Sequence, residues 1–97
     1  MSITYIIVLT YIRPLEEIDR HIADHVQWLN QGYEAGVFLA SGRRVPRVGG
    51  IILARGESIE DLQRRLNQDP FQQHGLARCE IIPFEASKCA HMLQGIL

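Results

Sequence analysis

Three side chains of one predicted helix carry most of the chemistry that the sequence offers. His21, His25 and Trp28 recur at spacings of four and three residues, so they share one edge of that helix. At about 100° per residue, His25 falls on the border of the helix's apolar face. An imidazole at such a border can have its protonation tuned and still reach a substrate. The pattern indicates that His25 is a candidate general acid or base. The structural alternative is that His25 only packs at the edge of the core.

The same two histidines, His21 and His25, have a spacing that can bring two imidazoles to one metal ion. The helix has the order His-Ile-Ala-Asp-His, without the glutamate of a metalloprotease motif and without an evident third ligand. The sequence also contains no phosphate-binding loop and no dinucleotide fingerprint. We therefore expect no metal and no cofactor, and keep His21 as a candidate substrate-binding residue.

A carboxylate follows the second predicted helix, in the sequence Asp69-Pro70-Phe71. Aspartate is a favoured N-cap, and Pro70 suits the first position of the short turn that would follow. The same carboxylate could instead orient a histidine of the first helix. The two roles are compatible because a carboxylate has two oxygens, so the sequence leaves both open.

Further candidates lie around a predicted hairpin. Ser41 and Gly42 close the second predicted strand, where glycine could let the backbone approach a ligand or could simply begin the turn. No nucleophile motif surrounds Ser41, so we do not expect a covalent intermediate on it. Arg43, Arg44 and Arg47 follow, and could bind an anionic group or form a solvated loop.

The first half of the chain predicts a strand, a helix and this hairpin. Residues 3–11 are β-branched and aromatic almost throughout, which is typical of a strand. A helical pattern runs from Pro14, tolerated at a helix start, to the stop signal Gly36. Two short apolar runs, 37–42 and 49–54, flank turn residues and predict two antiparallel strands.

The second half predicts a helix, a strand and a terminal extension. Ser58 begins a helix with a capping-box-like pattern, and Pro70 requires that helix to end. Residues 79–84 form a fourth strand, and the extension 86–97 predicts a short helix capped by Ser87. The order βαββαβ is the ferredoxin-like plan of an α+β protein, a four-stranded antiparallel sheet with both helices on one face.

Length and composition limit the classes of function. A chain of 97 residues has room for one domain, 1–97, and its net charge of -1 argues against a nucleic-acid partner. Its apolar stretches are shorter than the roughly 20 residues that span a bilayer. There is no basic region of a secretory signal, and two cysteines are too few for a disulfide scaffold. We expect a cytoplasmic domain without a membrane partner.

The first strand predicts an oligomer, because it is apolar on both faces while the helices can cover only one. A bare apolar face requires a cover, and a second copy of the sheet would provide one. We therefore expect a homodimer through the sheet face, with a higher oligomer also open. The two faces carry Ile3, Tyr5, Ile7, Leu9 and Tyr11, and Thr4, Ile6, Val8 and Thr10.

Taken in order, these motifs resemble the YCII-related (YciI-like) family of small dimeric α/β-barrel proteins. The resemblance covers nearly the whole chain, through Glu85. Its carriers are His25-Val26-Gln27-Trp28-Leu29, Glu34-Ala35-Gly36, Ala40-Ser41-Gly42, Asp69-Pro70-Phe71 and Ile82-Pro83-Phe84. The resemblance implies a ferredoxin-like fold that pairs into a dimeric barrel, with His25 and Asp69 in the family's paired site. The sequence departs from the family at Ile22, where an arginine is common.

The resemblance also implies a function for this pair. The family includes a lyase that eliminates chloride from a chlorinated hydroxyhydroquinone, and muconolactone isomerases look similar in architecture. We therefore expect a cofactor-independent lyase or isomerase for a small aromatic or enolisable metabolite. A non-catalytic binding or sensor module is the alternative, and a purely structural dimer is a third hypothesis. His25 would transfer the proton, and Asp69 would orient the imidazole ring of His25. The expected substrate-binding residues are Trp28, Tyr5, Ser41, Gly42, Phe71 and His21.

Overall fold

The sheet is built around its first strand. The computed structural model describes residues 3–97, beginning with β1, Ile3–Tyr11. This strand pairs with β3, Gly49–Arg55, on one side and with β4, Ala77–Glu85, on the other. β2, Phe38–Arg43, pairs with β3 and completes the order β2-β3-β1-β4, in which all neighbours are antiparallel. The predicted four-stranded antiparallel sheet is confirmed.

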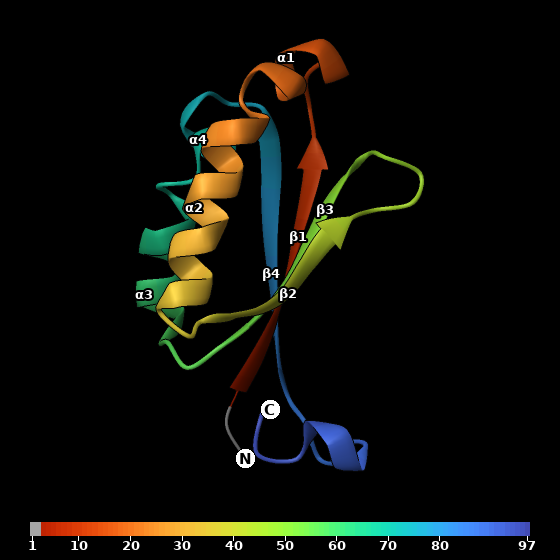
Figure 1. Cartoon of the computed structure of the whole chain (residues 1–97), viewed down its shortest axis with the longest axis vertical. Coiled ribbons are helices and arrows are strands. Elements are labelled where there is room, and N and C mark those ends of the chain that lie inside the picture. The colour runs from red at the N-terminus through yellow and green to blue at the C-terminus, as the bar shows by residue number, and fades with distance from the viewer. Residues whose placement is uncertain (1–2) are drawn as a thin grey trace.

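Three helices lie on one side of this sheet, as the ferredoxin-like plan requires (Figure 1). They are α2, Ile22–Glu34, α3, Ile59–Leu66, and α4, Pro70–Gln73, whereas α1, Leu15–Arg20, lies beyond the end of β1. The core between helices and sheet contains Tyr5, Ile7 and Leu9 of β1, packed with buried residues of α2, α3 and the other strands. Burial of this apolar area is the main favourable term that holds the two layers together.

The predicted first helix is interrupted at His21. The backbone at this residue has φ -114° and ψ 7°, outside the helical region, and it separates α1 from α2. Ile18 therefore belongs to α1, and α2 has its own set of buried residues. The buried positions of α2 are His25, Trp28 and Gly32, whereas Val26 is exposed. The prediction that His25 lies at the border of the apolar face was wrong, because Val26 and Tyr33, which the apolar pattern counts as core positions, are 44% and 38% exposed.

In the second half of the chain, the predicted N-cap of α3 is confirmed, whereas the C-terminal segment differs from its prediction. Ser58 is the N-cap of α3, and its hydroxyl accepts a hydrogen bond of 3.2 Å from the backbone N–H of Asp61. The C-terminal segment forms one 3₁₀ turn, η1, His91–Leu93, whose N-cap is Ala90. The predicted helix capped by Ser87 was wrong in that respect, because three residues of 3₁₀ structure leave no α-helix to cap.

The second face of the sheet carries a row of apolar side chains without helices over it. Register places these side chains on neighbouring positions of β1, β3 and β4, alternating with the residues of the core. Even without a covering layer, several of them are only partly accessible. They are Ile6, Val8, Ile51, Leu53, Ile82 and Phe84. Of the helices in residues 3–97, none has the length and apolar character needed to cross a membrane.

Candidate active site

Asp69 occupies the short connection between α3 and α4, where Pro70 keeps the backbone extended. Its side chain caps α4, since Oδ1 accepts a hydrogen bond of 3.0 Å from the backbone N–H of Phe71. The same Oδ1 lies 2.7 Å from Nδ1 of His25, across 44 residues of sequence. Asp69 is fully buried, so this contact is shielded from water. The capping and the orienting positions foreseen for Asp69 are occupied at once.

His25 is held from three directions. Asp69 bonds one ring nitrogen, Phe71 stacks on the imidazole with ring centroids 4.0 Å apart and planes at 6°, and Trp28 lies on a further side at 5.6 Å. His25 is 9% exposed, which leaves only a small part of the ring accessible. These contacts restrict both χ angles of His25, so the ring is fixed before any ligand arrives.

The carboxylate of Asp69 also determines which nitrogen of His25 can react. An ionised carboxylate only accepts hydrogen bonds, so Nδ1 of the imidazole must carry the proton that it donates to Asp69. Nε2 is then the nitrogen with a free lone pair, able to accept a proton. If it does so, the neighbouring negative charge stabilises the imidazolium that forms. Such an arrangement would allow His25 to act as a base, with Asp69 as the group that orients its ring.

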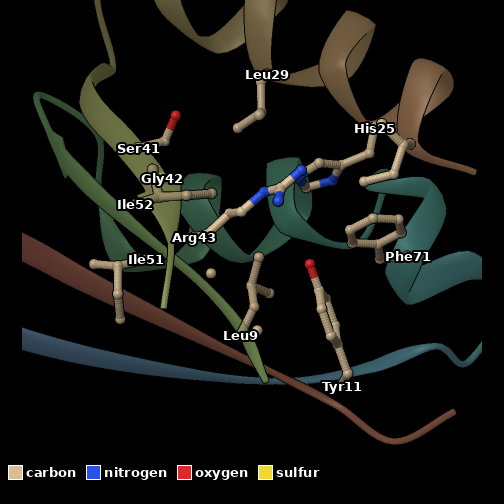
Figure 2. A pocket seen from close by; sticks show the side chains of 13 residues that line it. Leu9, Tyr11, His25, Leu29, Ser41, Gly42, Arg43, Ile51, Ile52 and Phe71 are labelled. Atoms are coloured by element: carbon tan, nitrogen blue, oxygen red, sulfur yellow. The ribbon is translucent and has the colours of Figure 1, made fainter. Parts of the chain in front are cut away.

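A cavity of about 150 Å³ lies beside this histidine, between α2 and the strands (Figure 2). Its walls come from β1, α2, the ends of β2 and β3, and α4, so residues far apart in the sequence meet there. Most of the lining is apolar. The lining residues are Leu9, Tyr11, Ile22, His25, Leu29, Ser41, Gly42, Arg43, Gly49, Gly50, Ile51, Ile52 and Phe71.

Three of the six expected substrate-binding residues line this cavity with His25. Ser41 and Gly42 contribute from β2, and Phe71 contributes from the first turn of α4. The Ser41 hydroxyl lies 2.7 Å from the hydroxyl of Tyr33, so it is already held in a hydrogen bond at the rim. The structure brings these residues together with the histidine, and their role in substrate binding stays a prediction.

Two other expected substrate-binding residues, Tyr5 and Trp28, belong to the core instead. The Tyr5 hydroxyl donates to the carbonyl of Glu57 at 3.0 Å, and the Trp28 indole N–H donates to the carbonyl of Arg65 at 2.9 Å. Neither side chain is among the residues that line the cavity. Because an aromatic side chain with a satisfied polar atom is stable in a core, sequence pattern alone could not separate the two cases.

His21 also lies apart from the cavity. Its ring stacks on His74 with centroids 4.1 Å apart, at the break between α1 and α2. The break turns His21 away from the edge that it would share with His25 on a continuous helix. Among residues 3–97, no group of three His, Cys, Asp or Glu side chains is arranged to hold a metal ion.

The sequence analysis did not assign Tyr11 or Arg43 to the pocket, although strand alternation contains the signal. Tyr11 follows Leu9 by two positions on β1, and Arg43 follows Ser41 by two on β2, so each shares a face with a cavity residue. Arg43 was considered only as one of three loop arginines. The first strand is already predicted to end at Tyr11, on the face of Leu9, and extending the second strand by one residue would have placed Arg43 toward the helices as well.

Comparison with known proteins supports the fold. No curated protein matches the sequence significantly. A solved 5-chloro-2-hydroxyhydroquinone dehydrochlorinase from Burkholderia phenoliruptrix, in complex with 2,5-dihydroxybenzoquinone, has a TM-score of 0.70 and 18% identity, covering 87% of this chain and 93% of that one. SnoaB, a cofactor-independent oxygenase from Streptomyces nogalater solved as a mutant, has a TM-score of 0.51 and 16% identity, covering 93% and 97%.

At these identities the two structures show a shared ferredoxin-like fold. The sequence itself gives the closer relationship, because the family model of the YCII-related domain matches residues 4–85, from β1 to the end of β4. That match contains both His25 and Asp69 and leaves out residues 1–3 and the C-terminal extension. The chain is a member of the YCII-related family.

Proposed function

We propose that this protein is a cofactor-independent acid–base enzyme. In it, His25 transfers a proton and Asp69 orients the imidazole ring of His25. The observation that carries the proposal is the 2.7 Å contact between His25 Nδ1 and Asp69 Oδ1, made by a histidine that also lines a cavity. A histidine buried only for packing would not need an empty volume beside it. Here the imidazole has an orienting group on one side and room for a ligand on the other.

The size and lining of the cavity support a small ring-shaped substrate. An apolar cavity of about 150 Å³ is the size that accommodates a benzene molecule. Leu9, Leu29 and Ile52 provide apolar walls, and Phe71 provides an aromatic one. The related dehydrochlorinase structure contains 2,5-dihydroxybenzoquinone, which is a small oxygenated ring of this kind. We infer an aromatic or enolisable metabolite, whose identity within that class is open to screening.

The chemistry available to this site is proton abstraction and return. His25 Nε2 would take a proton from a carbon or oxygen of the substrate, and the electron pair would move onto a conjugated oxygen. Return of the proton at a different atom gives an isomer, whereas loss of a leaving group such as chloride gives an elimination product. Both routes need a positioned base, which contributes typically 10²–10⁴-fold to the rate. A lyase or an isomerase is therefore the proposed activity.

The first test is a screen followed by two substitutions. Catechols, chlorinated hydroquinones, lactones and unsaturated dicarboxylates would be screened by the shift in melting temperature, and compounds that bind would be assayed for turnover. With any substrate found, His25→Asn should lower kcat by about 10²–10⁴-fold, because asparagine cannot transfer the proton. Asp69→Asn should also lower kcat while keeping α4 capped, because asparagine is an equally good N-cap.

The melting temperature of both variants serves as the control for folding. Full turnover by His25→Asn would contradict the acid–base proposal. Compounds that raise the melting temperature of the wild type without being converted would instead favour a binding or sensor module, since ligand binding to the folded state stabilises it without any chemical change.

A further inference from the structure

Arg43 is the last residue of β2 and faces the helix side of the sheet. In the register of the sheet it lies opposite Gly50, which in turn lies opposite Leu9 of β1. Gly50 has no side chain, and it lines the cavity together with Arg43 and Leu9. Figure 2 shows the Arg43 side chain extending from β2 through this space toward His25, and Arg43 is among the residues that line the cavity. A cation thus faces the catalytic histidine of the proposed function.

The other two arginines of the hairpin already have partners. Arg44 donates to the Thr10 hydroxyl at 2.9 Å, and Arg47 forms an ion pair with the Asp19 carboxylate. Within residues 3–97, Arg43 has neither an ion pair nor a side-chain hydrogen bond of this kind. A guanidinium has five N–H donors in a planar fork, and this one directs its donors into a cavity.

Tyr11 adds a second polar group to the same cavity. Its ring meets Phe71 edge-on, with centroids 5.9 Å apart and planes at 89°. Figure 2 shows its hydroxyl directed into the cavity, on the side between Phe71 and Leu9. A phenolic hydroxyl can donate to an anion that an arginine pairs with, so the two groups are complementary to one negatively charged oxygen.

We propose that Arg43 and Tyr11 form an anion-binding subsite facing His25, which selects small rings bearing an ionised oxygen, either a carboxylate or an acidic hydroxyl. The inference rests on the proposed function for the role of His25 and deepens it by naming the charge of the substrate. Arg43 is exposed to solvent and lines an apolar cavity, so its guanidinium is available to pair with an anionic oxygen of a ligand in that cavity. A conjugated carboxylate held there would also receive the electron pair when His25 takes a proton, where a fixed cation has its largest effect, whereas an ionised hydroxyl held there would serve as a charged anchor only.

The first arm of the test compares two probes of the same shape, benzoate and benzamide. Binding would be measured by calorimetric titration to the wild type and to Arg43→Gln, with Arg44→Gln as the matched control, because it removes the same charge one residue away. We expect Arg43→Gln to weaken benzoate binding by about tenfold or more, given the strength of charged hydrogen bonds. Benzamide affinity should be unchanged in Arg43→Gln, and Arg44→Gln should bind benzoate like the wild type.

The second arm distinguishes a carboxylate from a phenolate. Binding of 4-nitrophenol would be followed by absorbance, because its ionised form has a distinct visible band. If the subsite takes acidic hydroxyls, the bound probe is the phenolate in the wild type, and the fraction ionised falls in Arg43→Gln and, to a smaller extent, in Tyr11→Phe. If only benzoate shows the Arg43 dependence, the substrate class is restricted to carboxylates.

Two outcomes would overturn the subsite. One is that neither benzoate nor 4-nitrophenol binds to the wild type. The other is that Arg43→Gln and Arg44→Gln bind each of the two probes with the same affinity. Failure of the proposed function is separately visible in His25→Asn, which should still bind benzoate through Arg43. Suppose that His25→Asn kept full turnover while benzoate binding still depended on Arg43. The anion-binding subsite would then be supported, and the proposed role of His25 would be contradicted.

Discussion

At the scale of single residues, the site depends on how Asp69 is held. Its Oδ1 accepts from the Phe71 backbone and contacts His25, so the turn that follows the aspartate fixes the carboxylate. Phe71 then stacks on the imidazole that the carboxylate contacts. A short side chain fixed by backbone, with an aromatic ring from the same turn, loses little conformational freedom when a ligand binds. The geometry is thereby set in advance.

Cys79 provides a prediction about pH at this scale. It lies on the helix side of β4, where burial, and secondarily the charge of Asp69, raises the pKa of its thiol from 9.0 to about 11. Between those values the unfolded chain releases the proton and the folded chain keeps it, so the contribution of Cys79 to stability is lost as the pH rises from 9 to 11. Denaturation across this range should show a smaller fall in stability for Cys79→Ala than for the wild type.

Thiol alkylation gives an independent check of Cys79, because only the thiolate reacts rapidly. Iodoacetamide near pH 9 should modify Cys79 more slowly in the folded protein than in urea-unfolded protein, as measured by peptide mass spectrometry. The rate in the folded protein should then rise toward pH 11. Equal rates in the two states at pH 9 would contradict the raised pKa.

Residue patterns foresaw part of the site for identifiable physical reasons. The Asp69-Pro70-Phe71 motif is local, so its turn and cap follow from the chemistry of consecutive residues. The assignment of Tyr5 to the pocket failed because its position depends on a partner 52 residues away, the carbonyl of Glu57. Periodicity shows that a residue faces the helices, but whether packing or an empty volume lies there depends on the other layer.

At the scale of elements, the predicted first helix is broken at His21 into α1 and α2. A continuous helix would carry His21 and His25 on one edge, whereas the break separates them. Within α2, the buried residues are His25, Trp28 and Gly32, and His25 lines the cavity beside α4 and the end of β2. The sequence contained no proline or glycine at this break, so the usual signals for a helix interruption were absent. The order of the elements was predictable, and this interruption was not.

Gly32 gives a prediction about how closely α2 approaches β2. A Cβ added there would lie 2.2 Å from a ring carbon of Phe38, which is buried and packs against Trp28. Replacing glycine by alanine inside a helix usually stabilises by about 0.8–1.0 kcal/mol. Here the overlap outweighs that gain, and we expect Gly32→Ala to destabilise by roughly 1–3 kcal/mol in urea denaturation.

The control for Gly32→Ala is the neighbouring exposed residue of the same helix. Gln31→Ala should change the free energy of unfolding by less than about 0.5 kcal/mol, because its side chain lies at the surface. A stabilised Gly32→Ala variant would mean that Phe38 can move aside at little cost.

At the scale of the whole molecule, the uncovered face of the sheet requires an explanation. Ile82 and Phe84 are 41% and 38% exposed, and they adjoin Ile6 and Leu53 in one apolar surface. The helices that bury the opposite face leave this one open to a partner (Figure 1). A surface of this kind marks an interaction site. We propose that a second copy of the sheet covers it, as the strand pattern predicts.

Ile82→Lys tests this homodimer, because a lysine within the apolar surface would lose its hydration if the two sheets paired. The wild type should sediment at twice its chain mass of 11.1 kDa, whereas Ile82→Lys should shift toward the single-chain mass. The control is Gln63→Lys, which adds the same single positive charge at an exposed position of α3. A wild type that stays at the single-chain mass at micromolar concentration would contradict the prediction.

The contacts of Asp69 also bear on how such a protein could change over evolutionary time. His25 is tied to the rest of the chain mainly through its ring, whereas Asp69 holds the backbone of the following turn as well. A descendant that no longer needed the reaction could replace His25 with another ring or amide and stay folded. Loss of Asp69 would remove a cap along with the chemistry. In a lineage drifting away from catalysis, we therefore expect the histidine to disappear first and the aspartate to persist as a remnant.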